Sequence, residues 1–542
     1  MTQALRVRRS LVELQTEYSN GNKKPLEDLM RAWKGIKALP ASDPNSFFMI
    51  GGYHGEPFRG AGWGNASYWG GYCNHGNVLF PTWHRAYLAR LEQALQSIEG
   101  CHDVMLPYWD ETSEDSVKNG IPWALTQKDF VLDGQTIPNP LRSFVFNRNI
   151  KDHVNGDDPN YSKANGYETV RYPLSGLVGT PDDRAATEAH NAKFPDYDTN
   201  VRLLNQNITN WLGSYIVVDK QVIPTNVKNK FENCLNAPNY TVFSNTTSAA
   251  EWNDNLPAGT KAVVPLESPH NSIHLAVGGF DVPTGPNSGD YSPIAGANGD
   301  MGENDTAGLD PIFYFHHCFI DYVFWQWQKK HGYTDHLDVI EGYPGTNSVD
   351  NQGPTPGVVP NSWLTLDSPL DPFKVHHNGH ERAATSRDYI NIEKQLGFTY
   401  APGSLDELAQ EAPKLTATAV EEGHSNKVIR VSALNRARIR GSFLISAFAN
   451  IGGKRYHLGT EAVLSRWAIQ GCANCQTHLE VKAAFPLYGL RAQALGTADF
   501  EVEVHTRDGQ VQQNPPQLLQ AVAVPAGTAP APAQKAFRVE VR

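Results

Sequence analysis

The chain has 542 residues, with 57 acidic and 46 basic side chains and a formal net charge of −11 at pH 7. This acidic balance, without a Lys/Arg-rich run, argues against nucleic acid or an anionic membrane as the main partner. Aromatic residues make up 10% of the chain beside 46 glycines and 36 prolines, a composition of loop-rich globular proteins that excludes disordered and fibrous classes.

The N-terminus, residues 1–13, lacks the apolar core and small-residue cleavage site of a secretory signal, and no apolar run reaches membrane-spanning length. We therefore expect an intracellular, cytoplasmic protein. Six cysteines are few for this length, so a disulfide framework is not expected.

Residues 1–50 are predicted to be helical, with apolar side chains on one face. A loop rich in Gly, Trp and Tyr follows from Gly51 and reaches Cys73-Asn74-His75. The next segment, residues 80–95, has a proline near its start and an apolar stripe that includes His84. We expect a helix there, with His84 pointing inward.

Two histidines stand four residues apart in the segment 264–279. Pro269 can serve as an early helical residue and Gly278 as the stop. Helical geometry would place His270 and His274 on one face, close enough to bind one ion.

The segment 310–327 is apolar on most of its circumference, which predicts a buried helix. His316 and His317 lie in its middle. A histidine in such a helix is either a core residue or a metal ligand, and the other histidines decide between these alternatives.

The second part of the chain changes to alternating apolar and polar residues. We predict a first domain over residues 1–400, a linker over 401–425 and a C-terminal β-sandwich over 426–542. The first domain is expected to be mainly helical.

The inward histidines form two sets of three, a count that suits two metal ions, each with an open position. Imidazole ligands without carboxylates favour copper or zinc, and hydrolytic zinc pairs usually include Asp or Glu. We therefore expect two copper ions. The expected ligands are listed as His54, His75 and His84, and His270, His274 and His317, with His316 beside the last.

Cys73 lies two residues before His75. A cysteine at this spacing can form a thioether bond to the ring of a copper-binding histidine and so anchor a ligand from a flexible loop. The alternative is an ordinary buried thiol.

The chain resembles type 3 copper proteins, and the long, fungal-type tyrosinases in particular. The resemblance covers nearly the whole chain and rests on five motifs in the right order: residues 52–58, 73–75, 80–88, 270–274 and 310–321. It implies a helical bundle with a dicopper centre between facing helices, copper A and copper B held by the two sets of three histidines, and a Cys73–His75 thioether. In this family the histidine directly before a Cys-Phe-Ile-Asp-like segment binds the metal, which favours His317 over His316.

The resemblance also implies residues that act on the substrate. In similar tyrosinases a Glu and an Asn at the positions of Glu267 and Asn271 hold a water that takes the phenol proton. A helix cap for Glu267 and a surface amide for Asn271 are the alternatives. Leu275 is expected to line the substrate entrance.

The tail resembles a lid domain that inserts a side chain into the dicopper pocket and keeps the enzyme latent. The position of the blocking residue in the family points to Val463 or Leu464. Cys472 and Cys475 could load copper, because paired thiols select Cu(I), whereas a disulfide or a half-site for structural zinc are the alternatives.

The implied activity is a latent tyrosinase that uses O2 to hydroxylate monophenols and to oxidise o-diphenols to quinones, as in melanin-type pigment formation. A catechol oxidase or o-aminophenol oxidase is the nearest alternative, and a haemocyanin-like oxygen carrier is a third. The expected partners are small phenols and O2, without nucleic acid or membrane. The sequence does not reveal the oligomeric state, and a homodimer is one assembly that it allows.

Overall fold

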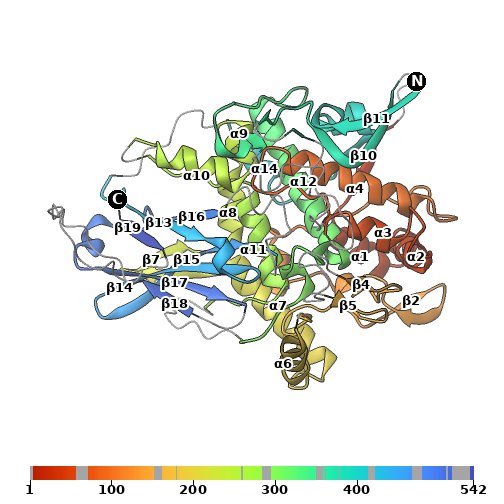
Figure 1. The fold of residues 1–542 in the computed structure, drawn as a ribbon, viewed down its shortest axis with the longest axis horizontal. Coiled ribbons are helices and arrows are strands. Elements are labelled where there is room, and N and C mark those ends of the chain that lie inside the picture. Colours follow the sequence, from red (N-terminus) through yellow and green to blue (C-terminus); the bar gives the residue numbers. More distant parts are fainter. Residues whose placement is uncertain are drawn as a thin grey trace.

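The structure, a computed structural model, describes residues 4–55, 71–151, 162–178, 180–257, 260–283, 294–348, 358–359, 362–377, 379–412, 422–466, 479–507, 511–514 and 537–541. Within these ranges no helix is both long and apolar enough to cross a bilayer. The predicted order, a helical first part followed by a β-sandwich, is confirmed (Figure 1).

The first part begins with three helices, α1 (Leu11–Ser19), α2 (Lys24–Ala38) and α3 (Phe47–Gly52). The predicted apolar face of α2 is buried, and its Leu26, Met30, Trp33 and Ile36 are 0% exposed. The hydroxyl groups of Ser10 and Ser46 accept backbone hydrogen bonds and cap α1 and α3. The Ser46 cap fixes where α3 begins, and His54 follows two residues after the end of this short helix.

Three further helices form the centre of this part: α4 (Phe80–Gln96), α11 (Glu267–Val277) and α12 (Ile312–His331). Figure 1 shows α12 between α4 and α11, and both contact it. On α12, Asp321 forms buried ion pairs with Arg85 at 2.5 Å and with Arg8 at 3.3 Å. Leaving either charge without its partner would be costly in this interior, so the pairs fix how α4 and α12 pack.

Shorter elements surround this centre. The helices are α5 (Glu114–Asn119), α6 (Pro181–Asn191), α7 (Tyr197–Gly213), α8 (Val227–Cys234), α9 (Tyr240–Ser244), α10 (Thr246–Asp254), α13 (Ile392–Leu396) and α14 (Asp406–Gln410). The strands pair two by two: β2 (Asp129–Leu132) with β3 (Gln135–Pro138), β4 (Ile150–Lys151) with β5 (Ser162–Lys163), β6 (Tyr215–Val218) with β7 (Gln221–Pro224), β8 (Asn347–Ser348) with β9 (Ser362–Trp363), and β10 (Pro369–His377) with β11 (His380–Thr385).

Strands β1 (Arg6–Arg8) and β12 (Phe398–Tyr400) pair in parallel and bring the ends of the first part together. The chain then stays on the helical part, because the hydroxyl of Tyr322 on α12 donates to Asp406 of α14 at 2.6 Å. Residues 413–421 lie outside the described residues. The domain boundaries themselves stay a prediction.

The C-terminal part consists of two sheets that share one apolar core. The first sheet has the order β16 (Glu480–Pro486), β13 (Val428–Asn435), β19 (Arg538–Val541). The second has the order β15 (Lys454–Val463), β14 (Phe443–Ile451), β17 (Asp499–Thr506), β18 (Val511–Asn514). All pairings within these two sheets are antiparallel.

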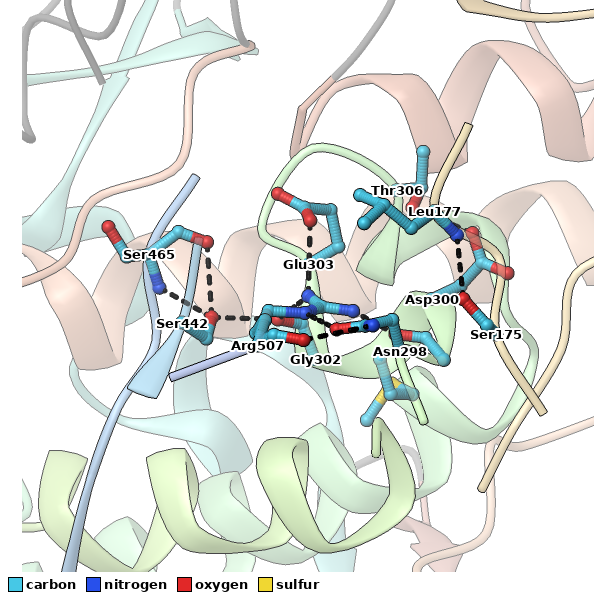
Figure 2. A network of polar contacts seen from close by, with 12 residues as sticks. Ser175, Leu177, Asn298, Asp300, Gly302, Glu303, Thr306, Ser442, Ser465 and Arg507 are labelled. Carbon is cyan, nitrogen blue, oxygen red and sulfur yellow. Dashed lines mark hydrogen bonds and ion pairs between the residues drawn. The ribbon is translucent and has the colours of Figure 1, made fainter. Parts of the chain in front are cut away.

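The two parts share an interface in which β15 lies against α11 (Figure 1). Leu444, Ala462 and Leu464 of the C-terminal part pack into the core of the helical part. Figure 2 shows a polar contact beside them, where Arg507 donates to the carbonyl of Gly302 at 2.6 Å and pairs with Glu303 at 3.1 Å. The C-terminal part is therefore fixed to the segment that precedes α12.

Candidate metal centre and its pocket

The first set of histidines comes from three different elements. His54 follows α3, His75 lies in the loop before α4, and His84 lies on α4. Their ring centroids are 5.3 Å (His54–His75), 5.7 Å (His54–His84) and 5.1 Å (His75–His84) apart. The Nε2 atoms of all three are buried and have no hydrogen-bond partner among the described residues.

The second set comes from two helices, α11 and α12. The Nε2 atom of His317 lies 3.2 Å from Nε2 of His270 and 3.2 Å from Nε2 of His274. Nitrogen ligands at 2.0–2.1 Å from one tetrahedral ion would lie about 3.3 Å apart. The spacing of these three atoms therefore fits a single ion.

Hydrogen bonds to the other ring nitrogen orient the histidines. Nδ1 of His54, His84 and His274 donates to the backbone carbonyls of Asn304 (3.1 Å), Phe80 (2.8 Å) and Met301 (2.8 Å). Because each Nδ1 carries the proton, each Nε2 presents a bare lone pair, as metal-ligating histidines do. Nδ1 of His270 is held by the side chain of Asn271 at 2.9 Å.

Burial keeps these rings neutral. It lowers the pKa of His84 to about 3 and that of His274 to about 4. It also lowers the pKa of His54, His75, His270 and His317 well below the usual histidine value. Neutral imidazoles are the form that binds a metal, so the residues present fit a pair of copper ions.

The two sets adjoin each other. The rings of His84 and His317 stack with their centroids 4.5 Å apart, and those of His75 and His270 lie 5.6 Å apart. Two ions held by these sets would be close neighbours. The geometry is therefore that of one binuclear centre with both halves in contact.

His316 belongs to the same four-histidine group on α11 and α12, but its Nδ1 contacts a carboxylate. Glu111 lies 2.6 Å away, and both side chains are fully buried. The sequence did not point to Glu111, whose position after the apolar segment 106–109 gave no sign of this contact. His317 is distinguished from His316 by its Nε2 contacts to both other histidines of the set.

Cys73 is a buried free thiol beside the first set. The ligand atoms of Cys73, His54 and His75 all lie within 4.8 Å of one another. Burial raises the pKa of the thiol, and its sulfur accepts contacts from Asn304 and Arg466 at 3.7 Å. The described geometry brings Cys73 and His75 together, as the sequence predicted.

Glu267 is the first residue of α11, and its carboxylate contacts other segments. One oxygen accepts from the backbone N–H of Gly76 at 2.7 Å, and the other accepts from Thr246 N at 2.8 Å and Oγ1 at 2.9 Å. Burial raises its pKa, although these hydrogen bonds act in the opposite direction. Glu267 therefore joins the loop that carries His75 to α10 and does not cap α11.

A cavity of about 280 Å³ opens beside this centre, between the helical and the C-terminal parts. His75, Glu267 and Asn271 line it from one side, and Val463 and Leu464 from the other. Leu275 lies one helical turn beyond Asn271, is fully buried in the core and is not among the residues that line this cavity, so its entrance role stays a prediction.

The two candidate blocking residues have different surroundings. Leu464 packs in the core of the helical part, whereas Val463 packs in the core of the C-terminal sheets. Cys472 and Cys475 lie outside the described residues, as do residues 56–70 with Glu56, Pro57 and Phe58 of the first motif.

Two adjoining sets of three histidines, one from α4 and the segments before it and one from α11 and α12, are the arrangement of a type 3 copper protein. Residues 44–330 match the common central domain of tyrosinase. The chain is 53% identical to the tyrosinase HcTyr2 of Hahella sp. (strain CCB-MM4) over 93% of this chain and 92% of that protein. It is 47% identical to a tyrosinase of Aspergillus oryzae, over 90% of this chain and 91% of that protein.

Comparison with a solved structure also shows similarity to a tyrosinase. A tyrosinase from Burkholderia thailandensis at low pH is 51% identical, with a TM-score of 0.81 over 94% of this chain and 100% of that one. The chain thus belongs to the tyrosinase family. Its cofactor is a pair of copper ions, and it is a copper-dependent monophenol monooxygenase and o-diphenol oxidase.

Proposed function

We propose that His54, His75 and His84 hold one copper ion and that His270, His274 and His317 hold the other. The observation that carries this assignment is the convergence of the two sets, in which hydrogen bonds fix the δ nitrogens of His54, His84, His270 and His274. The Nε2 contacts of His317 support it over His316 as the sixth ligand.

The copper pair, when bound, supplies the reduction and activation of O2. The residues of this chain supply neutral imidazoles, of which those of His54, His84, His270, His274 and His317 are buried, and a cavity beside them that both parts of the chain line. A free phenol has a pKa of about 10 and must lose its proton before it can bind a metal. We assign this step to a water held by Glu267 and Asn271, which both line the cavity beside His75.

The same proposal includes a thioether between Cys73 and a ring carbon of His75. Its formation would remove the thiol hydrogen and one ring hydrogen as two protons and two electrons, and O2, the oxidant of this enzyme, would accept them and become hydrogen peroxide. A peptide that contains both residues and is lighter by two hydrogen atoms would identify the bond, and a peptide of unmodified mass would count against it.

The C-terminal part is proposed to keep the enzyme latent, with Leu464 as the blocking side chain. Leu464 lines the cavity and packs in the core of the helical part, which supports this choice over Val463. Copper loading by Cys472 and Cys475, a homodimer, the lack of nucleic-acid and membrane partners, and a cytoplasmic location stay predictions from the sequence.

The test compares the copper-loaded chain before and after removal of residues 426–542, with tyrosine and with a simple catechol as substrates. We expect little turnover of either substrate before removal and turnover of both after it. Turnover of the catechol alone would indicate a catechol oxidase. No turnover of either substrate, before or after removal, would favour an oxygen carrier.

A further inference from the structure

The C-terminal part contributes a cation to the cavity beside the metal centre. Arg436 begins a short 3-10 helix, Arg436–Arg438, and lines the cavity together with Glu267, Asn271 and His75. Its backbone is fixed, because its N–H donates to the carbonyl of Leu479 at 2.9 Å. The guanidinium therefore faces the same space as the groups that are proposed to act on the phenol.

Arg436 is a half-buried residue, and one nitrogen of its guanidinium lacks a partner in the described part of the chain. Its Nε atom is buried without a hydrogen-bond partner, and no described residue forms an ion pair with it. Burial lowers the pKa of Arg436, and the charge of Glu267 opposes this effect. An arginine held in this way is costly for the fold, because guanidinium groups in protein interiors are normally paired.

The four acidic side chains that line the cavity have hydrogen-bond partners of their own, and Glu251 accepts from Nδ2 of Asn255 at 3.1 Å. Glu461 pairs with Lys230 at 2.9 Å and accepts from Ser268 at 2.8 Å, and Glu480 accepts from the backbone N–H of Ala433 at 2.7 Å. Glu267 accepts the three hydrogen bonds described above.

Lys482, the other cationic side chain among the lining residues, pairs with Asp254 at 2.9 Å. Arg436 is thus left as the donor in the described wall of this cavity that an incoming anion could bind.

We propose that the cavity of the intact chain binds a small aromatic carboxylate, with Arg436 as the residue that holds the carboxylate. A guanidinium matches a carboxylate by two parallel, charge-assisted hydrogen bonds. Ile445, Ala462, Val463 and Leu464 supply an apolar wall for the ring. The volume of about 280 Å³ is near the lower end of small-molecule sites, which are about 300–1,000 Å³.

This inference rests on the proposed function, since it names the substrate class of the same pocket. It implies that phenols bearing a carboxylate are preferred while the C-terminal part is in place, and that this part selects substrates as well as closing the site. The preference should disappear when residues 426–542 are removed, because Arg436 is removed with them.

The experiment measures binding by calorimetry to the full-length, copper-loaded chain. The probes are benzoate, its neutral analogue benzamide, and the cation phenethylammonium. We expect benzoate to bind about ten-fold or more tightly than benzamide, as charge-assisted hydrogen bonds would give. In Arg436→Gln this ratio should fall close to one. Arg438→Gln, an exposed arginine of the same short helix, should keep it.

Arg436→Lys serves as a second variant that keeps the charge and should retain part of the preference. A benzoate preference that survives in Arg436→Gln would come from the copper ions and overturns the proposal, as would equal binding of the three probes or tighter binding of the cation. Calorimetry measures binding without any turnover. A chain that is inactive in the substrate test above can therefore still confirm or overturn this inference.

Discussion

At the residue scale, the metal centre depends on which nitrogen of each histidine carries the proton. The carbonyls of Asn304, Phe80 and Met301 accept from Nδ1 and leave Nε2 free. Burial disfavours the charged imidazolium form of these histidines, so the lone pair on each Nε2 stays available down to an acidic pH. Preorganised neutral ligands of this kind can bind copper without a change of protonation state.

Glu267 gives the first test at this scale. Glu267→Gln keeps the size of the side chain but removes the carboxylate that is proposed to hold the phenol-activating water. We expect monophenol hydroxylation to fall about 100-fold or more, the range of a lost general base, while diphenol oxidation changes little. Steady-state rates with tyrosine and with a catechol measure the two activities.

Glu251→Gln is the matched control, because Glu251 lines the same cavity. It should leave both activities unchanged. Equal losses of both activities in Glu267→Gln would assign Glu267 a structural role in joining the His75 loop to α10.

Three of the proposed ligand histidines could be placed from the sequence because their signal is local. His270 and His274 stand four residues apart in a helix, and His84 lies on an apolar stripe, so each could be placed on an inward face. Glu111 and Arg436 could not be found in this way, because their roles arise from contacts between distant segments. The entrance role of Leu275 stays a prediction, since a position next to a ligand does not tell which wall a neighbour faces.

At the element scale, β15 is the strand that joins the C-terminal part to the metal centre. It lies against α11, and its last residues lead directly to Leu464. Its regular alternation sends neighbouring side chains to opposite faces, so Val463 enters one core and Leu464 the other. The alternation predicted the strand, but only the packing separates the two candidate blocking residues.

We expect Leu464→Ala to raise the activity of the intact chain several-fold, because the shortened side chain would no longer fill the space beside the dicopper pocket. The measurement is catechol oxidation by the full-length, copper-loaded protein. Val463→Ala also removes buried atoms but from the core of the C-terminal sheets, so it should lower stability by about 1–2 kcal/mol without raising activity. An equal rise in both variants would point to general loosening of the domain.

The same strand carries His457, which is 3% exposed and whose ring Nε2 contacts Thr460 Oγ1 at 2.9 Å. Burial lowers its pKa to about 3, with Arg455 and His505 acting in the same direction and Glu503 against it. A histidine whose folded pKa lies below its unfolded value of about 6.5 destabilises the fold progressively as the pH falls from about 6.5 to about 3.

We therefore expect His457 to contribute up to about 1.4 kcal/mol of lost stability per pH unit in that window. Urea unfolding of the intact chain at pH 7 and pH 5 measures the effect, and His457→Gln should reduce the difference without abolishing it, because the histidines of the metal centre also have lowered pKa values. His380→Gln, an exposed histidine of β11, should leave it unchanged. An unaltered pH dependence in His457→Gln would contradict the assignment.

At the scale of the whole molecule, the C-terminal part also supports the segment that orients two of the copper-site histidines. Arg507 contacts Asn298 at 2.5 Å, the carbonyl of Gly302 at 2.6 Å and Glu303 at 3.1 Å, as Figure 2 shows. Met301 and Asn304, in the same stretch, provide the carbonyls that hold His274 and His54. The interface and the metal centre are therefore parts of one hydrogen-bonded structure.

Arg507→Gln tests this connection. It would remove the positive charge that faces the buried Glu303 and the hydrogen bonds to Asn298 and Gly302, so we expect a loss of about 3–5 kcal/mol, read as a lower urea midpoint of the intact chain. In combination with Glu303→Gln the loss should be smaller than the sum of the two single losses. Arg491→Gln, an exposed arginine of the same part, is the control. Additive losses would show that the two charges do not depend on each other.

The most direct test of the assigned centre is anomalous diffraction at the copper edge from crystals of the copper-loaded chain. We expect two separate copper peaks, one bonded to Nε2 of His54, His75 and His84 and the other to Nε2 of His270, His274 and His317, at about 2.0–2.1 Å. A single copper peak, the absence of any copper peak beside these histidines, or a bond to His316 in place of His317 would contradict the account.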